Sequence, residues 1–527
     1  MTTRTFQLAD VIELMADTVP DREALVTDTR SITYAELDER TTRLANHLAS
    51  LGVGRGDRVG IHAMNCPEWV EAFYGAMKIG AVPVNVNFRY VAEELRYLYA
   101  DAGCVATVVA PEYEAVLDEI AGGLPDLAHR IVLGEPYEQA LAAASPERAF
   151  DPRSPDDLYL IYTGGTTGMP KGVMWRHEDL IFGAMNASRL KMPADSPEQF
   201  AREAAANPGA LRLMALGPMM HGGGQWVMGN AHVAGGTLVL YCGRRFDPEA
   251  VWDLVEAAGV HSVGTIGDAM ARPLAEALAN PSRERDLSSM ISIGNGGAPL
   301  TAKVREQLRA VLPPNVIILD SYGASETGAA TARYDTGEGH SAPRFDANPE
   351  TSVLDPEGRV CAVGEVGMLA RRGNIPLGYW NDPVKTAATF TEVDGVRWVI
   401  PGDYARFEDD GSISLLGRGS VSINTGGEKV YPEEVEAALM HHPAVFDAVV
   451  VGTPSERWGE QVTALVQLRQ GHEADVENIR DECRSHVADY KVPKDILVVD
   501  AVTRTPVGKA DYVWAKRTAA ELLNLDV

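Results

Sequence analysis

Strand-like and helix-like segments alternate along most of the chain, and this alternation restricts the fold more than any other feature. Apolar, β-rich runs recur, and several are separated by segments of helical length such as 69–79 and 92–101. The β-rich runs are 57–62, 81–86, 105–110, 236–241, 260–266, 290–293 and 316–319. Strand, helix and strand at this spacing are typical of layered domains, so we predict an α/β fold.

Residues 34–51 are predicted to form a helix. Thr33 and Glu36 have the spacing of a capping box, in which each side chain bonds the backbone N–H at the other position. Leucines follow on one helical face, and Gly52 can end the helix.

The length of the chain predicts more than one domain. A chain of 527 residues exceeds what one hydrophobic core usually organises. The alternating pattern reaches about residue 415, and after Gly417 the units become shorter, with a strand-like run at 448–451 and a helical segment at 476–488. We therefore predict a large multi-layered domain followed by a small α/β domain.

The segment 191–210 interrupts the large domain between two glycine-rich motifs. It is polar and rich in alanine and proline. We predict a surface excursion rather than a part of the core.

The composition excludes several classes of protein. Hydrophobic residues make up 45% of the chain and charged residues 23%, as in soluble globular proteins. A net charge of −27 disfavours binding to nucleic acids or anionic lipids, so a nucleotide ligand would need a local site.

The five cysteines lack metal-ligand spacing, which predicts a reducing, cytoplasmic compartment. The sequence contains no apolar run of about 18 residues, so we predict neither a membrane span nor a signal peptide.

The sharpest local motif is YTGGTTGMPKG at 162–172, which follows the apolar run 158–161. Its glycines let backbone N–H groups converge, its threonines add hydroxyl donors, and Lys171 adds a positive charge. Such a loop favours binding of a polyphosphate. It matches neither the Walker loop nor the GxGxxG fingerprint of dinucleotide-binding folds, so kinase-like and NAD-dependent functions lose support.

The chain resembles the adenylate-forming superfamily of acyl-CoA synthetases, luciferases and amino-acid-adenylation domains, whose phosphate loop is similar to 162–172. Further motifs follow in the family's order over nearly the whole chain. They are PMMHGGG at 218–224, GGAPL at 296–300, DSYGASETG at 320–328, GD at 402–403, GR at 417–418 and TPVGK at 505–509. The resemblance implies a large adenylating domain over 1–419, a hinge at Ser420 and a small mobile domain over 420–527.

The resemblance also implies an ATP site. Tyr322 would stack on adenine, Ser325 would contact the α-phosphate, and Asp403 with Arg418 would hold the ribose. Taken alone, Tyr322 would more often be a packing residue and Asp403 a surface turn residue. The implied nucleotide-binding residues are Thr163, Gly164, Gly165, Thr166, Thr167, Gly168, Lys171, Gly297, Ala298, Pro299, Asp320, Tyr322, Gly323, Ser325, Asp403 and Arg418.

Three catalytic groups are implied in the same way. Glu326 would bind Mg²⁺ through a hard carboxylate oxygen, and His221 would separate ATP from the acyl chain. Lys509 would bring an ammonium group to the α-phosphate and the acyl carboxylate. Gly426 and Gly427 would let the backbone approach the pantetheine arm of CoA. The implied cofactors are therefore ATP, Mg²⁺ and coenzyme A.

Two positions depart from the family pattern. Ser325 stands where threonine is commonest, which keeps the hydroxyl and loses a methyl group. Ser420 stands at the hinge where the family often has Asp or Lys. A hinge depends on tolerant backbone dihedrals more than on a charge, so Ser420 can still serve.

The implied reaction needs no protein nucleophile. A carboxylate attacks the α-phosphorus of ATP, and the CoA thiol then displaces AMP from the acyl-adenylate; positioning and charge neutralisation suffice for both steps. The segment 323–327 fails the GxSxG pattern of serine hydrolases at its last position, and no HExxH zinc motif occurs. A hydrolase is therefore disfavoured.

The expected acid is bulky and apolar, such as a long-chain fatty acid or a steroid side-chain acid. The segments that the resemblance places around the acyl group are rich in small residues and contain no Lys or Arg. Their small residues are Gly222, Gly223, Gly224, Gly264, Gly267, Ala269, Gly294 and Gly296. These glycines would leave volume for a large acid, or they would serve backbone turns.

We expect an ATP-dependent acyl-CoA synthetase acting on a small-molecule carboxylic acid, with no nucleic-acid partner. A luciferase-like oxygenase and a carrier-loading protein are alternatives, because they share the first half-reaction. The sequence does not define the oligomeric state, and a homodimer is one assembly that the chain could form.

Overall fold

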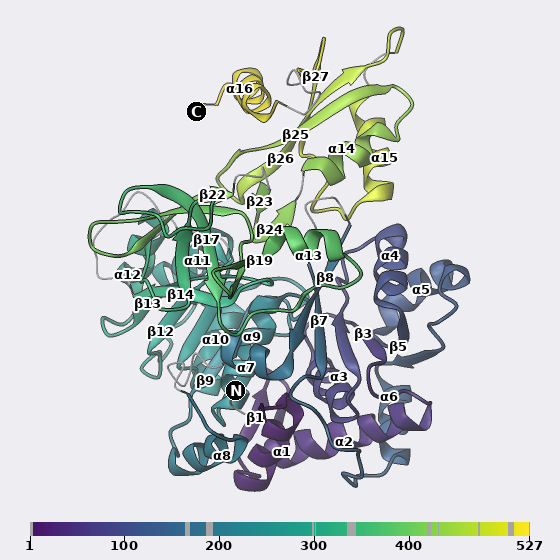
Figure 1. Cartoon of the computed structure of the whole chain (residues 1–527), viewed down its shortest axis with the longest axis vertical. Coiled ribbons are helices and arrows are strands. Elements are labelled where there is room, and N and C mark those ends of the chain that lie inside the picture. Colours follow the sequence, from purple (N-terminus) through teal and green to yellow (C-terminus); the bar gives the residue numbers. More distant parts are fainter. Residues whose placement is uncertain are drawn as a thin grey trace. The chain divides into compact units, whose positions relative to one another are not determined.

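A computed structural model describes residues 4–163, 169–185, 193–297, 300, 302–334, 344–418, 423–430, 432–472, 475–503 and 511–525. The chain divides into two compact units, both of mixed α/β structure, as predicted (Figure 1). Unit 1 comprises Met1–Phe88, Tyr99–Tyr162 and Gly172–Gly417. Unit 2 comprises Arg89–Leu98, Thr163–Lys171 and Arg418–Val527.

The first sheet of unit 1 has eight strands in the order β14-β13-β12-β11-β9-β10-β1-β2. Pairing is parallel from β13 to β1, and the two edge strands are antiparallel to their neighbours. The strands are β1 (Glu23–Val26), β2 (Ser31–Thr33), β9 (Arg212–Ala215), β10 (Thr237–Leu240), β11 (Ser262–Thr265), β12 (Ser292–Asn295), β13 (Ile317–Ala324) and β14 (Gly328–Tyr334).

A second sheet has seven strands in the order β18-β8-β7-β4-β3-β5-β6. Its strands are β3 (Arg58–His62), β4 (Val82–Asn85), β5 (Cys104–Val109), β6 (His129–Val132), β7 (Leu158–Thr163), β8 (Lys171–Arg176) and β18 (Gly378–Tyr379). Strands β7 and β8 flank the phosphate motif, whose residues 164–168 lie outside the described residues.

A third sheet, with the path β15-β22-β21-β17-β20-β19, is formed by antiparallel pairs. Its strands are β15 (Arg344–Phe345), β16 (Thr351–Leu354), β17 (Val366–Arg372), β19 (Phe390–Val393), β20 (Val396–Val399), β21 (Asp403–Phe407) and β22 (Ile413–Arg418). This sheet was not predicted as a layer of its own. Its strands are short, and no long helices lie between them in the sequence.

Thirteen α-helices lie before Arg418 among the described residues. They are α1 (Leu8–Thr18), α2 (Tyr34–Ser50), α3 (Pro67–Lys78), α4 (Ala92–Ala102), α5 (Glu114–Ile120), α6 (Glu135–Ala143), α7 (His177–Ala184), α8 (Pro197–Ala206), α9 (Gly222–Val233), α10 (Pro248–Ala258), α11 (Gly267–Ala279), α12 (Ala302–Val311) and α13 (Pro383–Thr389). Two 3₁₀ turns, η1 (Pro111–Tyr113) and η2 (Ala121–Gly123), flank α5.

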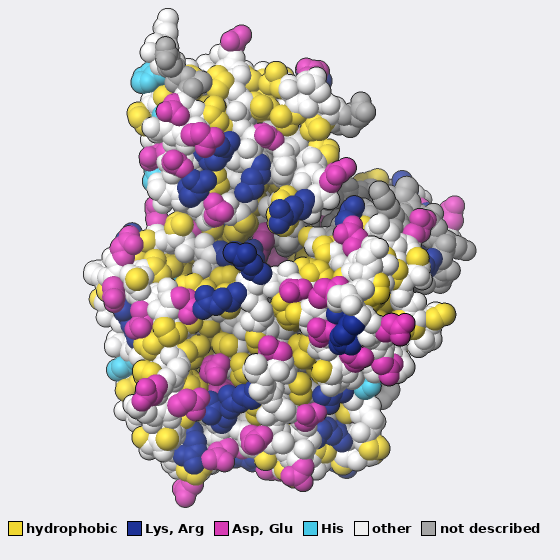
Figure 2. All heavy atoms as spheres, turned by 180° about the vertical axis from the view of Figure 1, so that it is seen from behind, with side chains coloured by type: hydrophobic (Ala, Val, Ile, Leu, Met, Phe, Trp, Pro, Cys, Tyr) yellow, Lys and Arg dark blue, Asp and Glu magenta, His cyan; other side chains and the backbone are white. Residues whose placement is uncertain are grey.

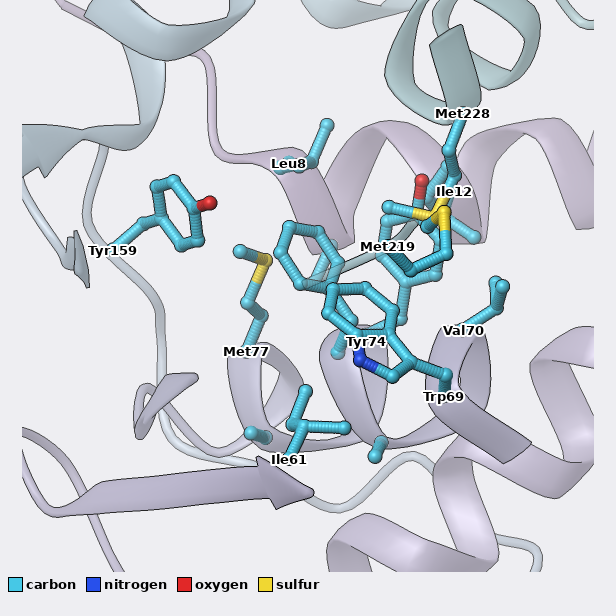
Figure 3. Close-up of a cluster of buried hydrophobic side chains, with 14 of the residues drawn as sticks. Leu8, Ile12, Ile61, Trp69, Val70, Tyr74, Met77, Tyr159, Met219 and Met228 are labelled. Carbon is cyan, nitrogen blue, oxygen red and sulfur yellow. The ribbon is translucent and has the colours of Figure 1, made fainter. Parts of the chain in front are cut away.

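The main core of unit 1 joins side chains of α1, α2, α3, α7 and α9 to side chains of the first two sheets. Trp69, Tyr74 and Met77 of α3 lie among Leu8 and Ile12 of α1 and Met228 of α9 (Figure 3). A second core covers the other face of the first sheet, where α10, α11 and α12 pack on Val263 and Ile293. The helices therefore lie on both faces of this sheet.

Unit 2 is built on a sheet with the path β24-β23-β26-β25, and β27 pairs with β26. Alternate residues of β25 serve the two faces: Ala448 and Val450 join the core with α14 and α15, whereas Val449 and Val451 join the core with α16. The elements are β23 (Ile423–Thr425), β24 (Glu428–Val430), α14 (Pro432–Met440), β25 (Val445–Ser455), β26 (Gly459–Leu468), α15 (Val476–His486), β27 (Asp495–Val499) and α16 (Tyr512–Leu523).

The predicted helix over 34–51 is confirmed as α2. The Thr33 side chain accepts from the Glu36 backbone N–H, and the Glu36 carboxylate accepts from the Thr33 N–H, which completes the capping box. Within 193–210, the described part of the predicted surface excursion, α8 is only partly exposed, so the prediction was wrong for this helix. Phe200 of α8 lies 5.2 Å from the Phe6 ring, and the apolar face of the helix is buried.

Acidic and basic side chains are interspersed on the face of the molecule that Figure 2 shows. All five cysteines are free thiols. Within the described ranges, no helix is both long and apolar enough to cross a membrane.

Candidate active site

Strand β13 and the turn that follows it carry five of the predicted site residues. Asp320, Tyr322 and Gly323 lie in the strand, and Ser325 and Glu326 lie in the turn before β14. The β13–β14 pairing shifts register between Tyr322 and Gly323. A Cβ at Gly323 would lie 2.4 Å from the Gly328 carbonyl oxygen, so this close backbone approach requires glycine.

The structure brings Tyr322 and Asp403 together, although they are far apart in the sequence. The Tyr322 hydroxyl donates a hydrogen bond of 2.6 Å to Oδ2 of Asp403, which begins β21. The Tyr322 ring lies 6.1 Å from the Phe345 ring and packs against the small core of the third sheet. The residues expected at adenine and ribose are therefore neighbours.

Asp320 is already engaged by two partners. Its Oδ1 accepts a hydrogen bond of 3.1 Å from Asn295 Nδ2, and its Oδ2 forms an ion pair with Arg305. Asn295 ends β12, and its Oδ1 accepts from the Gly267 N–H at 2.7 Å. Asp320 thus holds the end of β12, and Gly297 follows this strand with a φ of +78°. Ala298 and Pro299 lie outside the described residues.

Glu326 is positioned by residues that the sequence analysis missed. The Tyr379 hydroxyl donates a hydrogen bond of 2.9 Å to Glu326 Oε1. On either side of Glu326, Trp175 Nε1 donates to the Ser325 carbonyl at 2.9 Å, and buried Arg371 donates to the Thr327 carbonyl. Burial lowers the pKa of Arg371 from its ordinary value. No local motif marks these residues, because they reach Glu326 from distant segments.

His221 is the N-cap residue of α9 and is partly exposed. Amide side chains hold the loop before it: Asn65 Oδ1 accepts from the Met219 N–H at 2.7 Å, and Gln225 Nε2 donates to the Met219 carbonyl at 2.8 Å. Asn85 donates to the Met220 carbonyl. The sequence analysis also missed these three amides, which are dispersed in the chain.

The glycines expected around the acyl group fall into two classes. A Cβ at Gly224 would lie 2.8 Å from the Gly217 carbonyl oxygen, and one at Gly296 would lie 2.9 Å from Ser321 Oγ. Gly222 is also enclosed, and Gly267 has a φ of +57°. These four serve close packing or backbone conformation, so their interpretation as pocket volume was wrong.

Gly223, Gly264 and Gly294 form the open class, and a Cβ at the exposed Gly223 would meet no atom within 4 Å. Gly264 and Gly294 are paired across β11 and β12, on the face opposite the buried Val263 and Ile293. A Cβ at Gly294 would meet no atom closer than 3.9 Å, and one at Gly264 would lie 3.4 Å from Val227 of α9. A Cβ atom would fit at both positions, so close packing does not require glycine at either of them.

Several predicted residues can be placed only in part. Thr163 ends β7 and Lys171 begins β8, whereas Gly164, Gly165, Thr166, Thr167 and Gly168 lie outside the described residues. Arg418 ends β22, but its side chain is not described, and Ser420 and Lys509 also lie outside the described part.

In unit 2, Gly426 and Gly427 form the turn between β23 and β24 with φ values of +59° and +85°. A Cβ at Gly426 would lie 2.7 Å from the Trp458 ring. The Trp458 ring of the same unit therefore leaves no room for a side chain at position 426. This packing requires glycine there independently of the predicted approach of CoA.

The described residues contain no group of three or more His, Cys, Asp or Glu side chains able to hold a metal ion by themselves. Glu326 nevertheless suits Mg²⁺. Its Oε2 receives no hydrogen bond from the described residues, and Mg²⁺ is commonly held by one or two carboxylates together with substrate phosphates. A single carboxylate facing a nucleotide fits this pattern.

The chain is similar to known proteins over nearly its whole length. The AMP-binding enzyme family model matches residues 12–380, and the AMP-binding enzyme C-terminal domain model matches 434–509. The 3-oxocholest-4-en-26-oate–CoA ligase of Rhodococcus rhodochrous is 44% identical, with 98% of this chain and 97% of that protein covered. The medium/long-chain-fatty-acid–CoA/3-oxocholest-4-en-26-oate–CoA ligase of Mycobacterium tuberculosis is 45% identical, with 97% and 95% covered.

Among solved structures, the o-succinylbenzoate CoA synthetase of Bacillus subtilis has a similar fold. Its TM-score is 0.79 at 25% identity, and the alignment covers 95% of this chain and 96% of that chain.

Proposed function

Because the chain belongs to the AMP-binding enzyme family, we propose that it is an AMP-forming acid–CoA ligase, which activates a carboxylic acid with ATP and transfers the acyl group to CoA. The observation that carries this proposal is 44% identity to a named CoA ligase over 98% of the chain. The proximity of Tyr322 to Asp403, beside the turn that carries Glu326, supports a nucleotide site in unit 1.

In the first half-reaction, a carboxylate oxygen of the acid attacks the α-phosphorus of ATP, and pyrophosphate leaves. Tyr322 offers an aromatic face to adenine, Asp403 accepts from the ribose hydroxyls, and Ser325 donates to the α-phosphate. Glu326 would hold Mg²⁺, which when bound neutralises phosphate charge. His221, at the positive N-terminus of α9, separates the acid from the nucleotide.

In the second half-reaction, the CoA sulfur attacks the acyl carbonyl carbon, AMP leaves, and the thiol proton passes to solvent. Lys509 contributes its ammonium charge mainly to the first half-reaction, while the Gly426–Gly427 turn serves the approach of the pantetheine arm. The hinge assigned to Ser420 would let the small domain take part in both steps, with domains at 1–419 and 420–527.

The proposed acid is bulky and apolar, of the steroid side-chain or long-chain class. The two relatives above carry such acids in their names. Gly264 and Gly294 support the proposal, because close packing does not require glycine at either position. Burying each extra methylene of a substrate stabilises binding by about 0.8 kcal/mol, so a long or polycyclic tail would be strongly preferred over acetate.

The test is AMP release with ATP, Mg²⁺ and graded acids: acetate, octanoate, palmitate and 3-oxocholest-4-en-26-oate. We expect acyl-CoA and AMP in equal amounts, and the highest kcat/KM for palmitate or the steroid acid. A maximum at acetate would contradict the proposed acid class. A complete absence of CoA consumption with every acid would contradict the ligase.

Parallel assays with and without CoA separate the alternatives. A carrier-loading protein would form acyl-adenylate and leave CoA unused, and a luciferase-like enzyme would consume oxygen or emit light after adenylation. The proposal places the enzyme in the cytoplasm, where thiols such as CoA stay reduced. Its proposed assembly is a monomer or a homodimer, which light scattering would distinguish.

A further inference from the structure

Tyr379 makes the one hydrogen bond that the Glu326 carboxylate receives from the described residues. The Tyr379 hydroxyl donates to Glu326 Oε1 at 2.9 Å, although 53 positions separate the two residues in the sequence. Tyr379 is only 6% exposed. An O–H donor to an ionised carboxylate forms a charge-assisted hydrogen bond, which is stronger and more directional than a bond between neutral groups.

Tyr379 is itself held in place from several sides. Strand β18 pairs with β8, with Tyr379 opposite Val173. The Tyr379 N–H donates to Thr386 Oγ1 at 2.8 Å, and its ring meets the Phe390 ring edge-to-face at 5.8 Å. The hydroxyl therefore has a fixed position that does not depend on Glu326.

The backbone around Glu326 is held by the same region. Trp175, which belongs to the adjacent strand β8 and is fully buried, donates to the Ser325 carbonyl. Arg371 donates to the carbonyls of Thr327 and Gly183. With the turn fixed on both sides, the remaining freedom of Glu326 lies in its side-chain torsions, and the Tyr379 bond limits these.

We propose that Tyr379 is a positioning residue that orients the Glu326 carboxylate, with Oε1 held and Oε2 available to the divalent cation bound with ATP. This inference rests on the proposed function, because it takes Glu326 as the cation ligand. Hydrogen-bond partners of metal ligands set the direction and basicity of the ligating group, and their loss commonly weakens metal binding about 10- to 100-fold.

The test compares Tyr379→Phe with a matched control, Tyr137→Phe. Tyr137 is also buried and also donates to a glutamate, Glu71 Oε2, at 2.7 Å, but Glu71 is paired with Arg40 and is not a proposed site residue. Mn²⁺ affinity is measured by electron paramagnetic resonance with a non-hydrolysable ATP analogue, and the Mg²⁺ dependence of AMP release is measured in parallel.

For Tyr379→Phe, we expect Mn²⁺ affinity to fall about 10-fold, the Mg²⁺ half-saturation concentration to rise by a similar factor, and kcat at saturating Mg²⁺ to stay within about threefold. Tyr137→Phe should leave the metal titrations unchanged. Unchanged titrations in Tyr379→Phe, or equal shifts in both variants, would overturn the inference.

A second comparison separates an effect that acts through Glu326 from a general loss of structure. In a Glu326→Gln background, a residue acting through Glu326 should have no further effect, so adding Tyr379→Phe should not change Mn²⁺ affinity. A further loss would overturn the inference. If the wild type forms no acyl-CoA, the proposed function fails, whereas the Mn²⁺ titration still decides the role of Tyr379.

Discussion

The glycines of the candidate site differ in whether the backbone around them leaves room for a side chain. Gly224 lies so close to the Gly217 and Pro218 carbonyls that any side chain would disturb the start of α9. At Gly264 and Gly294, by contrast, an added Cβ would meet no atom closer than 3.4 Å. Both kinds look alike in a sequence, so only the backbone geometry separates structural glycines from those that provide volume.

We predict that Gly294→Val discriminates between acids by size. Its branched side chain would occupy space proposed for the acyl group. We therefore expect kcat/KM to fall at least about tenfold for 3-oxocholest-4-en-26-oate and little for octanoate. Such a loss matches the roughly 1–3 kcal/mol that one methylene group is worth in a hydrophobic pocket. Steady-state kinetics with both acids checks this.

Gly122→Ala is a suitable control, because a Cβ at Gly122 would meet no atom within 4 Å and the position is exposed in η2. It should leave both acids unaffected. Equal losses for the two acids in Gly294→Val would show that the position does not line the acyl site.

At the scale of elements, Asn85 joins two segments of the candidate site. Its Oδ1 accepts from the Tyr162 N–H at 2.7 Å, and its Nδ2 donates to the Tyr162 carbonyl at 2.9 Å and to the Met220 carbonyl. Tyr162 lies in β7 and is the first residue of the phosphate motif, and Met220 directly precedes His221. One buried side chain at the end of β4 thus joins Tyr162 to Met220.

We predict that Asn85→Ala lowers the free energy of unfolding by about 1–3 kcal/mol, because buried backbone groups lose their partner. It should also raise KM for both ATP and the acid. Asn65→Ala is the matched comparison: Asn65 holds the Met219 N–H but makes no bond to β7, so it should raise KM for the acid alone. The same KM pattern in both variants would contradict this division.

The sequence predicted those elements whose signals are local. The helix α2 followed from its capping box and leucine spacing, and β3, β4 and β5 followed from short β-rich runs. Burial of α8 could not be predicted, because it depends on Phe6 and Phe182, which reach Phe200 from other parts of the chain. The partners of Glu326 were missed for the same reason: a lone tyrosine at 379 carries no signal that it will meet residue 326.

At the scale of the whole molecule, three buried histidines link stability to pH. Burial lowers the pKa of His62 and His177 to about 3 and that of His232 to about 4. Their surroundings suit the neutral ring. His177 Nδ1 accepts from the Leu8 N–H at 3.3 Å, and His232 donates from Nε2 to the Ala24 carbonyl at 3.0 Å while Nδ1 accepts from Tyr74.

These lowered pKa values predict that the folded protein loses stability as the pH falls, beginning well above the pH range in which carboxylates titrate. Below pH 6.5 the histidines of the unfolded chain take up protons, whereas in the folded chain they stay neutral down to about pH 4, so the unfolded state binds more protons. Each histidine then costs about 1.4 kcal/mol per pH unit. The three together should lower the free energy of unfolding by about 4 kcal/mol between pH 7.5 and 5.5.

Urea unfolding followed by tryptophan fluorescence at pH 7.5, 6.5 and 5.5 measures this loss. His62→Phe removes one titrating group and keeps a flat ring against Tyr113, on which His62 stacks at 4.6 Å. The loss between pH 7.5 and 5.5 should therefore shrink by about 1.4 kcal/mol in this variant. The same loss should persist in His472→Gln, because His472 is exposed. An identical pH dependence in His62→Phe and the wild type would show that His62 is protonated in the folded state or does not contribute to the acid sensitivity.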